Sequence, residues 1–235
     1  MGQGSELAND DKQRSRPFLV LLVLVVLWAF GGQGCARGPI NFVSPDEIQN
    51  LAGQASCYAR GPGKEGRFRL GFYGNVPDQV KLELFNPLGG VESILWLNGP
   101  EAILYLPGEK VFWQGHGQLI TSDFFGTELE TRELIQMLAA RWAELEKQGG
   151  WKLLLDEEES VIAGEKGNLR FEIKERFSPG QIPRTIYFEA QGYMVRMRIL
   201  KIKFNHLEAK SVFRPTLPPA VRELPWEEIS ARWNR

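Results

Sequence analysis

Histidine and cysteine, which often serve in catalysis and in metal sites, are scarce in this chain of 235 residues, and its paired carboxylates are typical of solvated faces. It has two histidines, His116 and His206, and two cysteines, Cys35 and Cys57. Neither histidine has a partner at metal-ligand spacing, and no phosphate-binding glycine loop or Gly-x-Ser-x-Gly motif is present. We therefore expect no enzyme, no metal site and no cofactor. The net charge of −1 argues against a nucleic-acid partner.

Cys35 has the most informative chemical context. It follows a basic stretch, thirteen apolar residues from Phe18 to Phe30, and the small-residue segment 31–34. Thirteen residues are too few to cross the ~30 Å hydrocarbon core as a helix, so the pattern predicts a secretory leader. A membrane anchor that is never cleaved is the alternative. The segment resembles a bacterial lipobox, which implies an acylated Cys35 at the mature N-terminus, and Ala36 after it favours the outer membrane.

The second cysteine, Cys57, has two interpretations. Its neighbours Ala55, Ser56 and Ala59 are small, which favours a buried free thiol. A disulfide between Cys35 and Cys57 is the alternative.

The turn Asn86-Pro87-Leu88-Gly89 separates two strand-like runs within residues 82–96. Pro87 fixes φ, Gly89 permits positive φ, and Asn86 can bond its own backbone, so the pattern predicts a tight hairpin turn. Leu88 is unusual because an apolar side chain at a hairpin tip cannot reach the core. It either folds back over the hairpin or projects outward to contact lipid or a partner.

Apolar residues alternate with polar ones over much of the chain, which predicts a mainly antiparallel β fold around the turn and Cys57. We expect strands throughout 55–114 and again at 151–155, 160–163, 169–174, 185–190 and 193–204. The alternation changes phase in the last strand, which predicts a β-bulge near Ile199–Leu200. Helices are expected at 44–53, where Ser44 and Glu47 form a capping box, at 127–147, and at 225–233 with Trp226 and Ile229 on one side.

Strands between Ile94 and Trp113 are apolar on both faces, so each face must be covered by a helix or by an apolar ligand. The helix at 127–147 has one apolar face. Together they predict a lipid-binding cavity, although an ordinary packed core is the alternative. Its expected lining is Trp96, Tyr105, Phe112, Trp113, Leu134, Leu138 and Trp142.

These features together resemble the LolA/LolB lipoprotein-carrier superfamily, and most closely its LolB family of outer-membrane lipoprotein receptors. The resemblance rests on Leu82–Leu97 with the Asn-Pro-Leu-Gly turn, the helical insertion at 122–147 and the segment Ile182–Ile186. It implies an unclosed β-barrel covered by helices. The domains would be a leader (1–34), a tether (35–43), a LolB-like lipid-binding domain (44–214) and a proline-rich tail with a short helix (215–235).

The resemblance also implies a function. A monomer anchored through Cys35 on the periplasmic face of the outer membrane would accept the acyl chains of lipoproteins from a LolA-like periplasmic carrier. It would then deliver them to that membrane, with Leu88 in the turn needed for delivery. Two alternatives remain: an envelope protein of the same fold that binds another lipid or a glycolipid, and a structural lipoprotein whose core is filled by its own side chains.

Overall fold

The computed structural model describes residues 45–61, 64–178, 180–206 and 210–233. The leader, Cys35 and the tether lie outside these residues. Asn41–Arg235 is one compact unit by itself and contains every described strand, helix and core residue. We therefore expect this unit to fold without the segment that precedes it. Within the described ranges, no helix is both long and apolar enough to cross a membrane.

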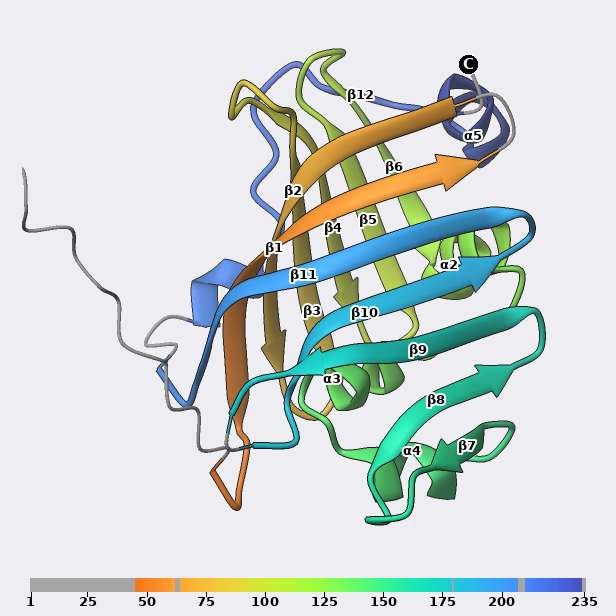
Figure 1. Cartoon of the computed structure of the whole chain (residues 1–235). Helices are drawn as coiled ribbons and strands as arrows, with labels where there is room; N and C mark the ends of the chain where they lie inside the picture. The colour runs from red at the N-terminus through yellow and green to blue at the C-terminus, as the bar shows by residue number, and fades with distance from the viewer. Residues whose placement is uncertain (1–44, 62–63, 179, 207–209, 234–235) are drawn as a thin grey trace, which may run out of the picture. The chain divides into compact units, whose positions relative to one another are not determined.

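Most of the unit is a single open sheet (Figure 1). Its strands are β1 (Asn50–Gly61), β2 (Lys64–Asn75), β3 (Gln79–Phe85), β4 (Val91–Asn98), β5 (Glu101–Leu106), β6 (Val111–His116), β7 (Lys152–Leu155), β8 (Val161–Lys166), β9 (Leu169–Arg176), β10 (Pro183–Ala190), β11 (Tyr193–Phe204) and β12 (Arg222–Glu223). They are ordered β12-β6-β5-β4-β3-β2-β1-β11-β10-β9-β8-β7. All neighbours are antiparallel except β12 and β6, and the two edge strands do not pair, so the sheet is unclosed. The expected fold class is confirmed.

The helices are α2 (Gly117–Phe125), α3 (Thr131–Leu138), α4 (Trp142–Lys147), α5 (Trp226–Trp233) and the 3-10 helix η1 (Lys210–Phe213). α2 contacts β5, β6 and β10, and α3 contacts β3. Figure 1 shows α2 and α3 behind β9–β11. We call the face they cover the inner face of the sheet and the opposite face the outer face. The predicted terminal helix is confirmed as α5, with Ile229 fully buried and Trp226 half-buried against the core.

The helix expected at 44–53 is wrong. Residues 45–49 are irregular, and β1 begins at Asn50 and continues through Gly53 to Gly61. Leu51 is fully buried in this strand. β1 pairs along its whole length with β2 and over most of it with β11, and these ladders outweigh the local capping signal.

The predicted β-bulge in the last strand is confirmed. Gln54 of β1 lies opposite Lys201, but the next residue, Ala55, lies opposite Ile199, so Leu200 is an extra residue in β11. The bulge keeps Ile199 and Ile202 on the buried side of the strand although they are three positions apart. It also increases the local bend of β1 and β11.

A glycine permits the close approach of chains beside this bulge. A Cβ atom on Gly53 would lie 2.2 Å from Cζ of Phe72 and 2.6 Å from the carbonyl oxygen of Lys201. We expect Gly53→Ala to lower the free energy of unfolding by about 1–3 kcal/mol, because the phenyl ring and the β11 backbone must both move. Chemical denaturation followed by circular dichroism measures this change.

Gly66→Ala in β2 is the matched control. A Cβ atom on residue 66 would meet nothing within 4 Å, so the free energy of unfolding of this variant should be unchanged or slightly higher. Equal stability of the two variants would contradict the proposed close packing at the bulge.

Candidate functional site

The turn at Leu88 is a rigid, exposed hairpin tip. The amide of Gly89 donates to the carbonyl oxygen of Asn86 at 2.9 Å. The amide of Asn86 donates to the carbonyl oxygen of Gly90 at 2.9 Å. The Gly90 amide also donates to Oδ1 of Asn86 at 2.9 Å. Gly89 has φ of 88°, a conformation that glycine adopts without strain.

Leu88 lies at the end of this turn with 97% of its surface exposed. Of the two positions that the sequence allows, the structure has the outward one. A leucine in this position forgoes burial worth roughly 1.5–3 kcal/mol. The three hydrogen bonds around Asn86 hold the turn so that its backbone does not let the side chain fold back.

The seven residues predicted to line a lipid cavity do not lie on one face. Phe72, Leu82, Leu95, Leu104 and Trp113 form a cross-strand row on the inner face. Trp96 pairs with Lys81 and Ile103, and Tyr105 pairs with Ile94 and Phe112, so Trp96, Tyr105 and Phe112 lie on the outer face. Side chains alternate along a strand, so Phe112 and Trp113 point to opposite sides.

The outer-face aromatic residues are covered by the C-terminal part of the chain itself. Nε1 of Trp96 donates to the carbonyl oxygen of Val212 at 3.3 Å, and η1 contacts β3. Trp96 is 3% exposed and Phe213 of η1 is also 3% exposed. At Trp96 both faces are thus covered, and the cover on this side is η1 and not a helix of the insertion.

Side chains also fill the inner face. Trp142 of α4 stacks on Phe171 at a ring-centroid distance of 5.4 Å, and Trp151 packs on the same ring at 5.6 Å. Leu134 and Leu138 are half-buried against this core. Trp113 packs against Trp226 of α5 at 4.9 Å.

Two pockets in the described part of the chain have volumes of about 360 and 370 Å³. Neither is lined by any of the seven predicted residues. Those of the seven that lie on the inner face contact other side chains of the core.

The helix expected at 127–147 is broken in two. α3 ends at Leu138, Ala140 has φ of 56°, and α4 begins at Trp142. The guanidinium of Arg141 at this break donates to the carbonyl oxygens of Pro45 and Asp46. The break turns Trp142 toward Phe171 and links the helices to the start of the fold.

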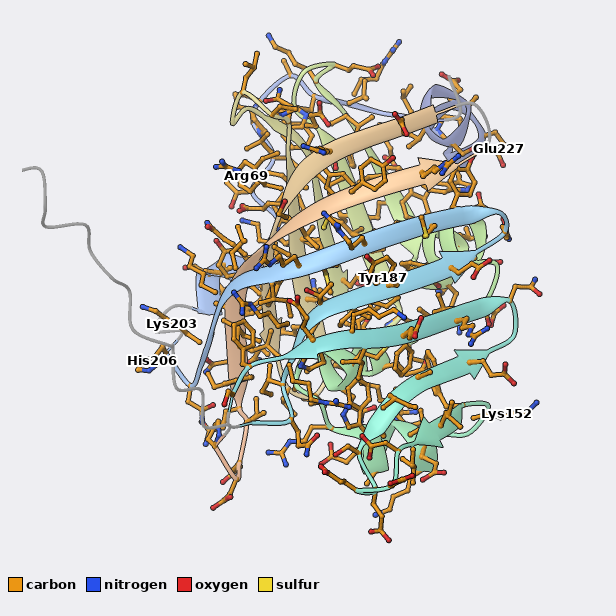
Figure 2. All side chains as sticks on the ribbon, in the orientation of Figure 1. Arg69, Lys152, Tyr187, Lys203, His206 and Glu227 are labelled. Atoms are coloured by element: carbon orange, nitrogen blue, oxygen red, sulfur yellow. The ribbon has the colours of Figure 1, made fainter. Side chains whose placement is uncertain are left out.

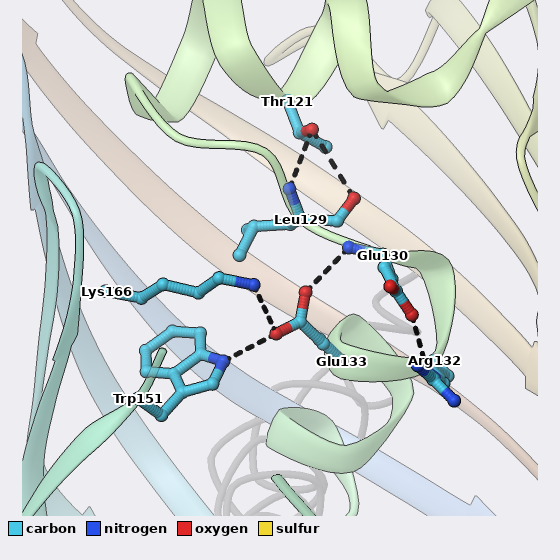
Figure 3. Close-up of polar contacts among 7 residues, drawn as sticks. All are labelled: Thr121, Leu129, Glu130, Arg132, Glu133, Trp151 and Lys166. Carbon is cyan, nitrogen blue, oxygen red and sulfur yellow. Dashed lines mark hydrogen bonds and ion pairs between the residues drawn. The ribbon is translucent and has the colours of Figure 1, made fainter. Parts of the chain in front are cut away.

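A buried carboxylate holds α3 against the second half of the sheet (Figure 3). Glu133 is 1% exposed. Its Oε1 accepts from Nε1 of Trp151 at 2.7 Å and from Nζ of Lys166 at 2.7 Å, and its Oε2 accepts from the Glu130 amide at 2.7 Å. Glu133 is not on the apolar face of the expected helix, so the amphipathic pattern does not predict its burial. The sequence signal for this position of Glu133 is its spacing from Glu130, which is that of a capping box. A capping box holds the Glu133 side chain close to its own helix.

Cys57 is a free, buried cysteine. Burial raises the pKa of its thiol to about 12, so almost none of it is thiolate near neutral pH. The inert buried thiol is the correct interpretation. Among the described residues, no group of three or more His, Cys, Asp or Glu side chains could hold a metal.

Comparisons with known proteins complete this description. No protein-family model matches the chain, and no curated protein matches it significantly. Its structure is similar to that of a DUF1329 family protein from Desulfovibrio piger, at 11% identity and a TM-score of 0.49, over 72% of this chain and 91% of that one. It is also similar to a LolA superfamily protein from Nitrosomonas europaea, at 10% identity and a TM-score of 0.46, over 75% and 93%. At these values the likenesses say nothing about ligands or partners.

We expect Glu133→Ala to lower the free energy of unfolding by about 3–5 kcal/mol, because it leaves the Lys166 ammonium and the Trp151 and Glu130 donors without their shared acceptor. Glu146→Ala, on the exposed side of α4, should change stability by less than about 0.5 kcal/mol. Urea unfolding of both variants measures the difference. A small loss at Glu133 would show that the helices are held mainly by their apolar contacts.

Proposed function

We propose that this chain is an acyl-anchored envelope protein that accepts the acyl chains of lipoproteins from a periplasmic carrier and inserts them into the outer membrane. It acts as a monomer and without catalysis. The single observation that carries the proposal is Leu88, an almost fully exposed leucine on a hydrogen-bonded hairpin tip. The leader pattern, Cys35 and the resemblance of residues 82–97 to the LolB family support the same function.

In this proposal Leu88 enters the outer leaflet, or the exit of the carrier, while cargo is released. An apolar side chain on a short turn can enter lipid while the amides of Asn86, Gly89 and Gly90 keep their hydrogen bonds within the turn. The tip would therefore disturb the bilayer locally and leave the sheet intact.

Acyl chains reach the inner face when α3 and α4 move away from the sheet, since side chains fill that face in the present conformation. The break at Ala139–Arg141 gives α4 a hinge of its own. Glu133 and Arg141 supply polar anchors that can open and reform. Displacement of Trp142 from Phe171 would expose an apolar surface on both the helix and the sheet.

A structural lipoprotein is the second candidate function. The observation that favours it is the stacked cluster of Trp142, Phe171 and Trp151, which fills the space beneath the helices without a ligand.

Leu88→Glu should separate stability from function. We expect a change of less than about 0.5 kcal/mol in stability, because no buried contact is lost. The variant should accept a lipoprotein from the carrier and yet fail to transfer it to liposomes. Leu154→Glu is the matched control, since Leu154 is 56% exposed on β7, and it should transfer normally.

Normal transfer by Leu88→Glu would make the tip passive and the mechanism wrong. A fluorescent fatty-acid probe separates the two candidate functions in the unaltered fragment Asn41–Arg235. Saturable binding with quenching of tryptophan emission supports acyl-chain handling. Absence of binding supports the structural lipoprotein.

The anchor is tested by Cys35→Ala in the full chain expressed with its leader. We expect this variant to lose labelling by radioactive palmitate, and its processed form should leave the membrane fraction in a wash at about 1 M salt, where surface charges are screened. Cys57→Ala should stay labelled and membrane-bound. A leaderless Cys35→Ala protein that resists the salt wash would rule out the acyl anchor.

A further inference from the structure

The outer face of β1, β2 and β11 carries an unusual concentration of positive charge. We call this surface the basic strip. It consists of seven exposed cationic side chains: Arg60, Arg67, Arg69, Arg196, Arg198, Lys201 and Lys203. The three strands contain one acidic residue, Glu65. The whole chain has a net charge of −1, so this excess is a property of one face and not of the composition.

Strand register brings these cations together from distant parts of the chain. Ser56 of β1 lies between Arg69 of β2 and Arg198 of β11, and Tyr58 lies between Arg67 and Arg196. At these two positions the central strand, β1, carries uncharged side chains while both neighbouring strands carry cations. Figure 2 looks onto this face and labels Lys203, which lies at one end of the strip, and Arg69, which lies near its middle by register.

The β-bulge extends the strip along β11. Outward positions are even up to Arg198 and odd from Lys201, because Leu200 is the extra residue. Without that residue Lys201 and Lys203 would point into the core. From Arg196 to Lys203 the cations follow about 23 Å of strand at roughly 3.3 Å per residue.

These cations lack the acidic partners that some cations on other strands have. On β3, next to the strip, Lys81 forms an ion pair with Glu83 at 2.7 Å, and on β9, beyond β10, Lys174 pairs with Glu172. No member of the basic strip forms an ion pair with any residue that the structure describes. Mutual repulsion on adjacent strands is unfavourable, so an unpaired array of this size indicates an anionic partner.

One recess lies within the strip. A pocket of about 360 Å³ is lined by Tyr58, Glu65, Gly66, Arg67 and Arg196. The hydroxyl of Tyr58 donates to Oε2 of Glu65, the carboxylate that lines this recess, at 2.6 Å. Arg67 and Arg196 flank the recess, and two guanidinium groups can bind the oxygen atoms of a phosphate in pairs.

The arrangement favours a lipid surface over a protein partner. Protein interfaces have an apolar core with a polar rim, whereas the centre of this strip is Gln54, Ser56 and Tyr58. The exposed apolar residues of its strands are few: Leu200 lies between Arg198 and Lys201, and Tyr193 and Met194 begin β11. Leu88 lies just beyond Phe85, which pairs with Arg69. A spread of cations with a few exposed apolar side chains matches a layer of phosphate headgroups above hydrocarbon.

We propose that the basic strip docks on the headgroup layer of a bilayer that contains anionic phospholipid. Docking lays β1, β2 and β11 along the membrane, with Arg67 and Arg196 holding a headgroup phosphate in the recess. The inner face and the helices then point away from that membrane. This goes beyond cargo transfer, since it requires neither an acyl chain in the protein nor the anchor at Cys35.

The test is sedimentation of the fragment Asn41–Arg235 with vesicles and no cargo. We expect it to bind vesicles of phosphatidylcholine and phosphatidylglycerol in equal parts, to bind pure phosphatidylcholine much less, and to dissociate at about 1 M salt. The triple variant Arg69→Gln, Arg198→Gln, Lys201→Gln should lower the partition coefficient about a hundredfold, at about fivefold for each basic residue removed.

A triple variant with the same charge change elsewhere is the control. Lys147→Gln, Lys152→Gln, Arg222→Gln removes three exposed cations outside the strip and should bind like the unaltered fragment. Equal loss in both variants, or equal binding of the unaltered fragment to neutral and anionic vesicles, would overturn the proposal. Failure to bind anionic vesicles would also overturn it and would leave an acidic protein surface as the partner. The vesicle comparison needs no variant, so it holds even if a substitution disturbs folding.

Discussion

The described fold depends on how buried and exposed side chains alternate along β11, where one extra residue, Leu200, shifts that alternation by one position. Leu200 shifts the phase so that Ile199 and Ile202 both remain in the core. The same shift places Lys201 and Lys203 outside with Arg196 and Arg198. Gly53 on the paired strand gives the Phe72 ring and the β11 carbonyl room to approach. Packing, curvature and surface charge thus share one local cause.

The inner face shows how a curved sheet is completed without closing it. α2, α3 and α4 bring aromatic and aliphatic side chains to the concave side, and α5 adds Trp226 near Trp113. On this side Glu133 accepts hydrogen bonds from three donors, the Glu130 amide, Trp151 and Lys166. A network of this kind fixes where α3 lies more strictly than apolar packing does, because its distances and directions are specific. Any ligand on this face competes with side chains already in contact.

The outer face is divided between two kinds of surface. Over β3–β5, η1 covers Trp96, so aromatic side chains are buried there. Over β1, β2 and β11, within the described residues, the face is left exposed and is cationic. Leu88 lies in the turn between β3 and β4, beyond the position at which Arg69 pairs with Phe85. The apolar tip therefore lies a few residues beyond a strand position that pairs with the basic strip, and a membrane could contact both at once.

Local patterns in the sequence were sufficient for most of the strands, the bulge, the terminal helix and the presence of the turn at Asn86–Gly89. Alternation depends on neighbours two positions apart, and the turn at Leu88 is made by Asn86, Pro87 and Gly89 within one short segment. The phase change at Ile199–Leu200 was visible because the buried and exposed positions of β11 are both strongly marked.

Tertiary structure alone decided the rest. The capping pattern at Ser44 predicted a helix, but pairing with β2 and β11 made the segment from Asn50 a strand. Aromatic residues from both faces of β4–β6 were grouped into one cavity because composition does not say that a segment more than a hundred residues later covers Trp96. Arg69 and Arg198 looked like ordinary outward residues of separate strands. Only the pairing of β1 with both β2 and β11 places them on either side of Ser56. The residues of a strand determine that it is a strand, but which strands lie beside it depends on contacts between distant parts of the chain.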